Sequence, residues 1–372
     1  MATFRVSSET ELVEVVCAAR ESKRVFEIVG HGTKRGFGRP VECNDVLDLS
    51  GLTGIVNYEP DEMIITARAG TPVAEIEATL AEKNQRLGFE PADWGPLFGA
   101  PLNSGTIGGV LSADANGSAA VRYGRCRDHL LGFRAVNGFG EAYKAGGKVV
   151  KNVTGFDLPK LFCGAMGTLG PLAEVTLRAF PQPPILQTYV VENMSPEDGL
   201  ALLRRVWSSP LESSGLAFQG GTAFIRLEGY RAALDEKIAV LRSLSGAELQ
   251  RCSEADDPFR GIASGTIIDT SGVTVWRIHV PPADAAKLIS EIQPVSWCAD
   301  WAGGLLWAAC DLKSDVRGSA KRFDARAVRM RGGDSIPPFA PEDSVRADLT
   351  RSVKAAFDPL RLFNPGRMWE GV

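Results

Sequence analysis

The pattern of hydrophobic and polar positions near the N-terminus predicts a helix followed by a buried strand. Ser8 and Glu11 have the spacing of a capping box, and the apolar residues within 12–19 recur on one helical face, so we expect a helix from about residue 8 to 22. The apolar run VFEIVG, residues 25–30, predicts a buried strand. A glycine-rich loop, HGTKRGFG, follows this strand directly.

Further short strands and one helix are predicted before the first long loop. The runs LDLS (47–50), GIVNY (54–58) and MIITARAG (63–70) are typical of strands. Thr71 and Pro72 suit the N-cap and the first position of a helix that continues through PVAEIEATLAEKNQRL. Later in the chain, the dipeptide Asn-Gly in RAVNGFGEAY predicts a hairpin turn between two strands.

A proline cluster at 181–184 marks the clearest boundary in the chain. After it, helix and strand patterns alternate: FIRLEGY (224–230) and TVWRIHV (274–280) predict strands, and DEKIAVLRSL (235–244) predicts a helix. The final segment FDPLRLFNPGRMWE (357–370) returns to turn-rich chemistry. We therefore expect two lobes, with the tail packed on the first of them.

Composition and charge narrow the possible functions. A chain of 372 residues exceeds the size at which one hydrophobic core keeps growing. A net charge of −4 argues against nucleic-acid binding, which needs a basic surface. Because the sequence has neither a signal-peptide pattern nor an apolar run of about 18 residues, we expect a cytoplasmic chain with no membrane span, attached to a membrane at most peripherally. The seven cysteines form no CxxC pair, which disfavours iron–sulfur clusters and structural zinc.

Glycine-rich segments carry the candidate chemistry. The run GTIGGVLSADANGSAAVRYG spans 105–124, and shorter loops lie at 30–36 and 164–170. Glycine inside a helix or strand costs roughly 0.5–1 kcal/mol relative to alanine, so these runs need a reason such as close backbone approach to a ligand. No Walker A loop is present, since Gly147-Lys148 is followed by Val149, and no Rossmann fingerprint is present either. The remaining candidate is a ligand that has a diphosphate and large flat rings and is held by backbone N–H groups. FAD is such a ligand.

Four segments, in the same order, resemble the FAD-contacting motifs of the vanillyl-alcohol-oxidase-type, or PCMH-type, flavoproteins. They are IVGHGTKRGFG, TIGGVLSADANGSAAVRYGRCRDHLLGFRAVNGFGE, KNVTGFDLPKLFCGAMGTLG and FDPLRLFNPGRMWE. The resemblance implies an α+β fold in which a two-subdomain FAD-binding domain is joined to an α+β cap-like domain. The implied domains are a PCMH-type FAD-binding domain (1–182, with subdomains of about 1–50 and 51–182), a cap-like domain (183–355) and a tail (356–372) that returns to the FAD domain.

The resemblance also implies which residues bind FAD. The first loop would hold the pyrophosphate through its amides, the middle run would lie along the flavin and the ribityl-phosphate chain, the third loop would lie on the adenine side, and the tail would approach the flavin ring. For any one of these glycines, a simple turn is the alternative. The implied FAD-binding residues are Gly30, His31, Gly32, Thr33, Lys34, Gly70, Thr71, Pro72, Gly105, Thr106, Gly108, Gly109, Gly117, Tyr123, Gly124, Asp128, Thr168, Leu169, Gly170, Asn364 and Arg367.

The resemblance implies non-covalent FAD, because Thr33 stands where histidyl-linked relatives carry the attached histidine. The whole chain is similar to the FAD-binding subunits of bacterial glycolate oxidases, which convert glycolate to glyoxylate. This similarity implies a subunit of a hetero-oligomer that relays electrons from a catalytic FAD subunit to an iron–sulfur subunit. Two alternatives are a self-sufficient FAD-dependent 2-hydroxy-acid dehydrogenase and a non-redox scaffold subunit that has lost FAD.

The catalytic machinery cannot be assigned from the sequence. Relatives that oxidise 2-hydroxy acids carry histidine-rich motifs that bind a divalent metal, whereas this chain has only His31, His129 and His279, well separated. We therefore expect no metal site and name no catalytic base. Strand alternation puts His279 on the same face as Val275 and Arg277, and we expect this face at the surface.

Overall fold

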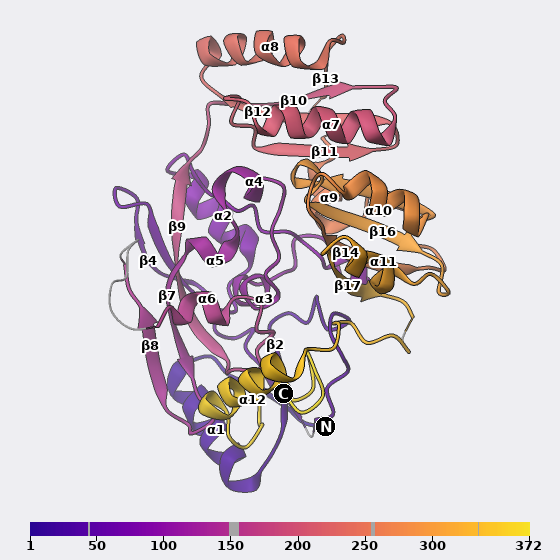
Figure 1. Cartoon of the computed structure of the whole chain (residues 1–372). Coiled ribbons are helices and arrows are strands. Elements are labelled where there is room, and N and C mark those ends of the chain that lie inside the picture. The colour runs from indigo at the N-terminus through magenta and orange to yellow at the C-terminus, as the bar shows by residue number, and fades with distance from the viewer. Residues whose placement is uncertain (44, 149–155, 254–256, 334) are drawn as a thin grey trace. The chain divides into compact units, whose positions relative to one another are not determined.

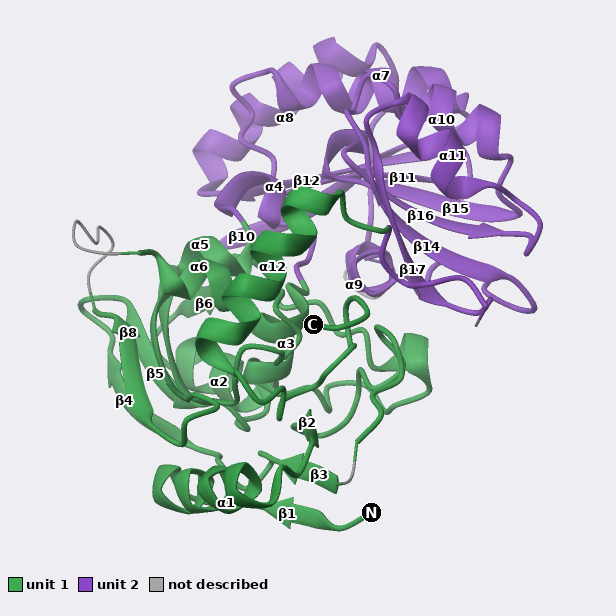
Figure 2. Ribbon diagram, turned by 60° about the horizontal axis from the view of Figure 1, so that its bottom comes forward, with its two compact units in different colours: residues 1–115, 125–181, 341–372 green, residues 116–124, 182–340 purple. Residues whose placement is uncertain are grey.

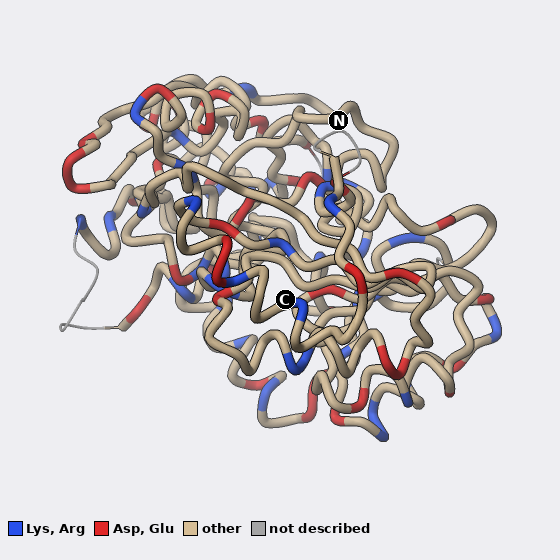
Figure 3. The backbone as a smooth tube through the Cα atoms, turned by 90° about the horizontal axis from the view of Figure 1, so that it is seen from above, with Lys and Arg blue, Asp and Glu red and all other residues tan. Residues whose placement is uncertain are grey.

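The computed structural model divides the chain into two compact units, shown in different colours in Figure 2. The structure describes residues 1–43, 45–148, 156–253, 257–333 and 335–372. Unit 1 comprises residues 1–115, 125–181 and 341–372, and unit 2 comprises residues 116–124 and 182–340. Unit 1 therefore contains both ends of the chain, with the indigo and yellow segments of Figure 1 side by side. Figure 3 shows basic and acidic residues interspersed along the chain, as the small net charge leads one to expect.

Unit 1 is built on two sheets. A parallel sheet has the strand order β1-β3-β2, and an antiparallel sheet has the order β4-β5-β9-β7-β8, with β6 also paired to β9. The elements are β1 (Thr3–Arg5), α1 (Glu9–Ser22), β2 (Phe26–Val29), β3 (Asp45–Asp48), β4 (Ile55–Glu59), β5 (Ile64–Arg68), α2 (Val73–Ala81), β6 (Gln85–Leu87), a 3-10 helix (Pro96–Phe98), α3 (Ile107–Ala113), α5 (Cys126–His129), β7 (Leu130–Val136), β8 (Ala142–Gly146), α6 (Leu158–Phe162), β9 (Leu172–Pro181) and α12 (Ser344–Phe357).

The predicted N-terminal helix is confirmed as α1. Its N-cap is Ser8, whose side chain accepts a hydrogen bond of 3.2 Å from the backbone N–H of Glu11. The Glu11 carboxylate accepts from Ser7 N at 2.7 Å, one residue before the position that a capping box requires. Leu12 and Val16 are fully buried in the core beside the small parallel sheet. The helix therefore forms where local capping and the apolar face agree.

The helix predicted from Thr71 is shorter than expected and has a different cap. Helix α2 ends at Ala81, because the following residues enter strand β6 and pair with β9. Pro72 holds the N-cap position without a side-chain hydrogen bond. The Thr71 hydroxyl is fully buried and donates to Arg68 O at 2.7 Å, while it accepts from Gly54 N at 3.0 Å. It thus satisfies the backbone of a tight turn, and the N-cap prediction for Thr71 is wrong.

Unit 2 consists of an eight-stranded antiparallel sheet in the order β13-β10-β12-β11-β15-β16-β14-β17, with helices on it. The predicted strands and helix at 224–230, 274–280 and 235–244 are confirmed as β12, β14 and α8. The elements are α4 (Ala120–Tyr123), β10 (Ile185–Val191), α7 (Pro196–Trp207), β11 (Gly215–Gln219), β12 (Thr222–Gly229), α8 (Arg231–Ser245), β13 (Gln250–Arg251), α9 (Phe259–Ser264), β14 (Thr274–His279), α10 (Ala285–Ile292), β15 (Ser296–Asp300), a 3-10 helix (Trp301–Gly303), β16 (Leu305–Cys310), α11 (Val316–Arg322) and β17 (Arg326–Arg331).

The two faces of this sheet differ in chemistry. Trp276 and Ile278 of β14 share one core with buried residues of α7, α8, α10 and α11, which cover the apolar face (Figure 2). On the opposite face, Val275 is fully buried, Arg277 is buried and His279 is half-buried, with its ring 5.5 Å from that of Trp301. The expected surface position of His279 is wrong. Alternation identifies the residues of one face, but only packing decides whether that face is covered.

Candidate functional site

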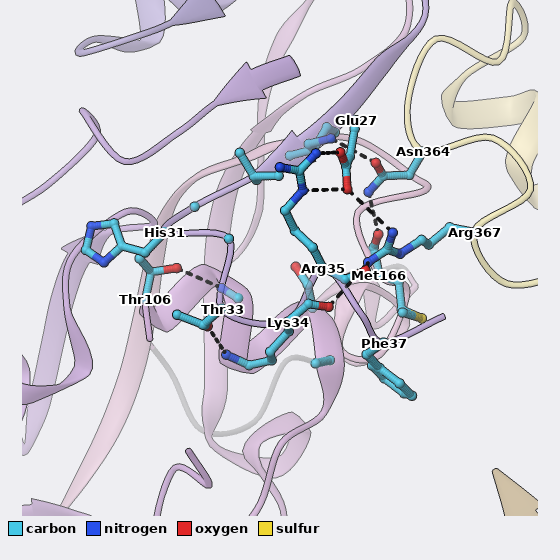
Figure 4. Close-up of a pocket in the computed structure, with 17 residues that line it drawn as sticks. Glu27, His31, Thr33, Lys34, Arg35, Phe37, Thr106, Met166, Asn364 and Arg367 are labelled. Atoms are coloured by element: carbon cyan, nitrogen blue, oxygen red, sulfur yellow. Dashed lines mark hydrogen bonds and ion pairs between the residues drawn. The ribbon is translucent and has the colours of Figure 1, made fainter. Parts of the chain in front are cut away.

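A pocket in unit 1 lies where strand β2, the 30–36 loop, helix α3 and the C-terminal tail meet (Figure 4). Its empty volume is about 540 Å³, a part of which is open to solvent. Residues of four parts of the chain that are far apart in the sequence, at 27–37, 106–113, 166 and 364–367, therefore form one site. The lining residues are Glu27, Ile28, Val29, Gly30, His31, Gly32, Thr33, Lys34, Arg35, Phe37, Thr106, Gly109, Ser112, Ala113, Met166, Asn364 and Arg367.

A second, mostly apolar hollow of about 440 Å³ continues from this pocket. It shares eight of its lining residues with the first pocket, among them Gly30, Thr106 and Asn364. Its additional lining residues are Leu49, Ala69, Gly108, Gly167, Gly170, Pro171 and Leu172. Because these residues are apolar or lack a side chain, this part of the site suits a flat, uncharged ring, whereas the 30–36 loop presents polar groups.

The loop after β2 presents an unusual row of hydrogen-bond donors. Within the described residues, the backbone N–H groups of His31, Gly32, Thr33 and Lys34 donate to no other group of the chain. Gly32 has a φ of 70°, in the left-handed region, at the centre of this loop. Successive N–H groups around such a residue form a concave binding site for anions. The loop is therefore suited to a phosphate group.

Lys34 adds a positive charge to this loop. Its Nζ atom donates to Thr33 Oγ1 at 3.3 Å, and a Cβ atom placed on Gly105 or Gly109 would lie within 3.4 Å or 3.7 Å of this nitrogen. Burial lowers the pKa of the Lys34 amine to about 8, while Asp93 opposes this effect. An anion bound beside Nζ would stabilise the charged amine and raise its pKa again, which is the chemistry that a diphosphate provides.

Two glycines allow the backbone segments around the pocket to approach closely. A Cβ atom on Gly30 would lie 2.5 Å from Thr106 Oγ1, and a Cβ atom on Gly108 would lie 2.8 Å from the carbonyl oxygen of Ala69. Thr106 is the N-cap of α3, where it accepts a hydrogen bond of 3.3 Å from Gly109 N. The glycines of this part of the motif therefore serve packing at the pocket wall, besides any contact with a ligand.

The C-terminal tail forms one wall of the pocket through Asn364. Its side chain accepts a hydrogen bond of 2.8 Å from Ile28 N in β2 and donates one of 2.7 Å to Met166 O. Arg367 donates to the carbonyl oxygen of Arg35 at 2.7 Å. The tail thus links β2, the 34–39 segment and the 164–170 loop, and this explains why turn-rich residues at the chain end belong to the site.

The structure brings some of the sequence-predicted residues together and leaves others outside the pocket. Two residues, Gly108 and Gly170, line only the second hollow. The residues that line the first pocket are Gly30, His31, Gly32, Thr33, Lys34, Thr106, Gly109, Asn364 and Arg367. The residues that line neither hollow are Gly70, Thr71, Pro72, Gly105, Gly117, Tyr123, Gly124, Asp128, Thr168 and Leu169.

Several residues outside the pocket have structural partners instead. Asp128 accepts a hydrogen bond of 2.9 Å from Arg125 N and caps α5. Gly117 and Tyr123 belong to unit 2, where Gly117 O accepts from the Trp301 indole at 3.1 Å and the Tyr123 hydroxyl donates to the buried carboxylate of Glu228. In the segment quoted for the third motif, residues 151–155 lie outside the described residues.

Sequence reasoning did not name eight of the residues that line the first pocket, among them Glu27, Arg35 and Met166. Glu27 is buried, accepts a hydrogen bond of 3.1 Å from Arg35 Nε and lies 3.6 Å from Arg367 Nη1. A charged residue in the middle of the apolar run VFEIVG was the available signal, because such a residue is seldom buried without a partner. Met166 carried no comparable signal.

Unit 2 holds a cation and an imidazole in direct contact. Arg277 Nη1 and His279 Nε2 are 2.7 Å apart, and the guanidinium carbon lies 5.4 Å from the Trp301 ring centroid and 5.9 Å from that of Trp307. In the part of the chain that the structure describes, no three His, Cys, Asp or Glu residues gather as a metal ion requires. Among the described helices, none is both long and apolar enough to cross a membrane.

Comparisons with known proteins agree with the chemistry of the pocket. Residues 1–146 match the FAD binding domain family. Over 361 residues the chain is 32% identical to the glycolate oxidase subunit GlcE of Escherichia coli (strain K12), with 96% of each chain covered. It is 23% identical over 399 residues to the glycolate oxidase subunit GlcD of Bacillus subtilis (strain 168), covering 91% of this chain and 83% of that protein. A structure of p-cresol methylhydroxylase with substrate bound aligns with a TM-score of 0.75 at 14% identity, covering 98% of this chain and 88% of that one.

These findings confirm the expected architecture and cofactor. The similarity to p-cresol methylhydroxylase shows the PCMH-type α+β fold. The unpartnered N–H row, the half-buried Lys34 amine and the adjoining apolar hollow fit a ligand with a diphosphate and flat rings. FAD is the cofactor of the matched domain family. Given its identity to GlcE over nearly the whole of both chains, this chain belongs to the family of FAD-binding oxidoreductases that includes the glycolate oxidase subunit GlcE.

Proposed function

We propose that the chain is the FAD-binding subunit of a glycolate oxidase complex, which converts glycolate to glyoxylate. The observation that carries this proposal is the row of four backbone donors at residues 31–34, in a chain that is similar to GlcE over 96% of its length. The proposed role is to pass electrons from a catalytic FAD subunit to an iron–sulfur subunit. Cytoplasmic localisation, with at most peripheral membrane attachment through the complex, stays a prediction.

Each part of the pocket has a role in holding the cofactor. The N–H groups of the 31–34 loop and the Lys34 ammonium would hold the diphosphate, and the apolar hollow that includes Leu49 and Pro171 would hold a flat ring. Asn364 and Arg367 would keep the tail against the pocket and exclude water from it. When bound, FAD supplies the capacity to accept and release electrons. The remaining residues of the predicted set stay proposals for the rest of the cofactor.

The relatives support an assembly of several chains. Two of them, GlcE and GlcD, are named as different subunits of glycolate oxidase, and both are similar to this chain over most of its length. A complex of this kind would therefore contain a second flavin chain of the same fold. Iron–sulfur clusters would belong to a further subunit, because the seven cysteines here are scattered without cluster spacing.

A self-sufficient 2-hydroxy-acid dehydrogenase is the second candidate, and one observation favours it. Oxidation of a 2-hydroxy acid needs a cation for the carboxylate and a base for the proton. Arg277 Nη1 and His279 Nε2 lie 2.7 Å apart on the sheet face where Arg277 is buried and His279 is half-buried. A non-redox scaffold, the third alternative, predicts a colourless protein that FAD does not reconstitute.

Two measurements separate these functions. The first is purification of the tagged chain from its native cell, with identification of the bound chains; the relay function predicts a second flavin chain and an iron–sulfur chain. The second is anaerobic addition of glycolate or D-lactate to the isolated FAD-loaded chain. Absorbance of the oxidised flavin should persist without the partners and be lost with them. Rapid bleaching by the isolated chain would instead establish the self-sufficient dehydrogenase.

A further inference from the structure

A buried lysine outside the pocket connects the C-terminal tail to the pocket wall. Lys354 on α12 forms an ion pair of 2.8 Å with Asp358, and the two side chains are only 2% and 0% exposed. Lys354 Nζ also donates to the backbone carbonyl oxygens of Thr168 at 2.6 Å and Phe363 at 2.7 Å. All three donor positions of the ammonium group are thus used, on three different segments.

Asp358 organises the turn through which the tail leaves α12. Its Oδ1 atom accepts from Leu362 N at 2.9 Å, and its Oδ2 atom accepts from Phe363 N at 2.9 Å as well as from Lys354. A Cβ atom on Gly138, in the loop between β7 and β8, would lie 2.6 Å from Asp358 Oδ1. The carboxylate therefore sits in a tightly packed position, with donors for both of its oxygens.

The residues that Lys354 contacts are close in sequence to residues that line the pocket. Thr168 is two residues from Met166, and Phe363 directly precedes Asn364; Met166 and Asn364 line both hollows. The ammonium group thus bonds to the 164–170 loop and to the C-terminal tail, the same two segments that the Asn364–Met166 hydrogen bond joins. The Lys354 contacts are therefore made within two residues of the pocket wall.

The cost of burying this pair argues for a role beyond stability. Burial lowers the pKa of Lys354, and the neighbouring Asp358 carboxylate opposes that effect. A buried ion pair is often no more stabilising than apolar residues of similar volume, because desolvation offsets the attraction. What the pair supplies here is a defined position for the segments around it, because its hydrogen bonds fix the tail at 362–363 and the 164–170 loop.

We propose that Lys354 and Asp358 are positioning residues for the cofactor pocket, and that docking of the C-terminal tail and binding of FAD favour each other. The ion pair holds the 362–364 segment against the 164–170 loop, so that this wall is formed in a larger fraction of the apoprotein and FAD binding increases that fraction further. This inference rests on the placement of FAD in this pocket under the proposed function. It is independent of the substrate and of the partner subunits.

The test compares Lys354→Met with a matched control, Arg351→Met. Arg351 lies on the same helix and forms an ion pair with Asp348, but both side chains of this pair are exposed. FAD is titrated into each apoprotein and binding is followed by flavin fluorescence; we expect a Kd at least tenfold higher for Lys354→Met and within twofold of wild type for Arg351→Met. The visible circular dichroism of the bound flavin should change only in the first variant.

Hydrogen exchange of the tail tests the coupling separately. FAD should slow amide exchange at residues 358–367 in the wild type, and Lys354→Met should exchange faster without FAD and regain protection at saturating FAD. An unchanged Kd together with an equal loss of thermal stability in apoprotein and holoprotein would mean a purely structural role and overturn the proposal. If Lys354→Met does not fold, Asp358→Asn is put through the same titration and exchange, and an unchanged Kd again overturns it. A wild-type chain that binds no FAD would refute the proposed function instead.

Discussion

The pH dependence of FAD binding provides the sharpest test of the pocket, through Lys34. The pKa of its amine is lowered from 10.5 to about 8 by burial. At about 1.4 kcal/mol per pKa unit, this difference means that the pocket penalises the charged amine by about 3–4 kcal/mol. Both the folded and the unfolded chain carry this proton below pH 8, so the penalty is present there. It is relieved between pH 8 and 10.5, and the free energy of unfolding of the apoprotein should rise over that range.

A diphosphate beside this amine reverses the preference. FAD binding should raise the pKa of Lys34 and take up a proton above pH 8, so affinity should fall as the pH rises. If the bound state restores a pKa near 10, the Kd at pH 9 should be about tenfold higher than at pH 7. Lys34→Met should weaken binding at pH 7 by about 1.5–3 kcal/mol, the range for a hydrogen bond to a charged group, and should remove this pH dependence.

The assay is titration of the apoprotein with FAD at pH 7, 8 and 9, in wild type and in Lys34→Met, at constant ionic strength. Lys23 provides a matched control: it is exposed, caps α1 and lies outside the pocket, so Lys23→Met should keep the wild-type slope with pH. A wild-type Kd that stays constant from pH 7 to 9, or an equal slope in Lys34→Met, would refute the placement of the diphosphate beside this amine.

Three further substitutions test the packing and the hydrogen bonds of the two units. Gly108→Ala puts a Cβ atom 2.8 Å from Ala69 O and should lower the free energy of unfolding by about 1–3 kcal/mol, which a urea titration measures. Asn364→Ala leaves a backbone donor and a carbonyl group unpaired; it should destabilise the chain by about 1–3 kcal/mol and raise the Kd for FAD. In unit 2, Ser118→Ala removes the 2.6 Å hydrogen bond to the buried Asp300 carboxylate and should lower the melting temperature while leaving the pocket of unit 1 unchanged; unaltered melting would contradict the importance of that bond.

Local sequence patterns were sufficient to predict the helices and strands that have a clear cap or a regular hydrophobic period. The Ser8 cap and the apolar face of α1 specify that helix within one stretch of chain, and β12, β14 and α8 follow from the same kind of periodicity. The glycine-rich loop after β2 identified the pocket for the same reason. Its backbone donors and the left-handed Gly32 are properties of a few consecutive residues.

Elsewhere, partners distant in the sequence overrode the local preference. Helix α2 ends early because residues 85–87 pair with β9, and Thr71 satisfies a turn at Gly54 rather than capping a helix. Alternation assigned Arg277 and His279 to one sheet face, but it carried no information about the Trp301 ring that lies against them. Secondary-structure propensity describes the conformation that a segment prefers by itself. In these cases, hydrogen bonds and packing with distant residues decided the conformation.

By itself, the sequence determined the helices and strands that have clear caps and a clear hydrophobic period. It also located the candidate ligand-binding residues in glycine-rich loops and indicated the class of cofactor that such loops bind. Only the tertiary structure decided which loops share a wall. Asn364 lies 336 residues from Ile28 and 198 from Met166, yet bonds to both, and Lys354 reaches Thr168 across 186 residues. The physical reason is that hydrogen-bonding capacity belongs to each residue type, whereas the choice of partner depends on which surfaces the folded chain buries together.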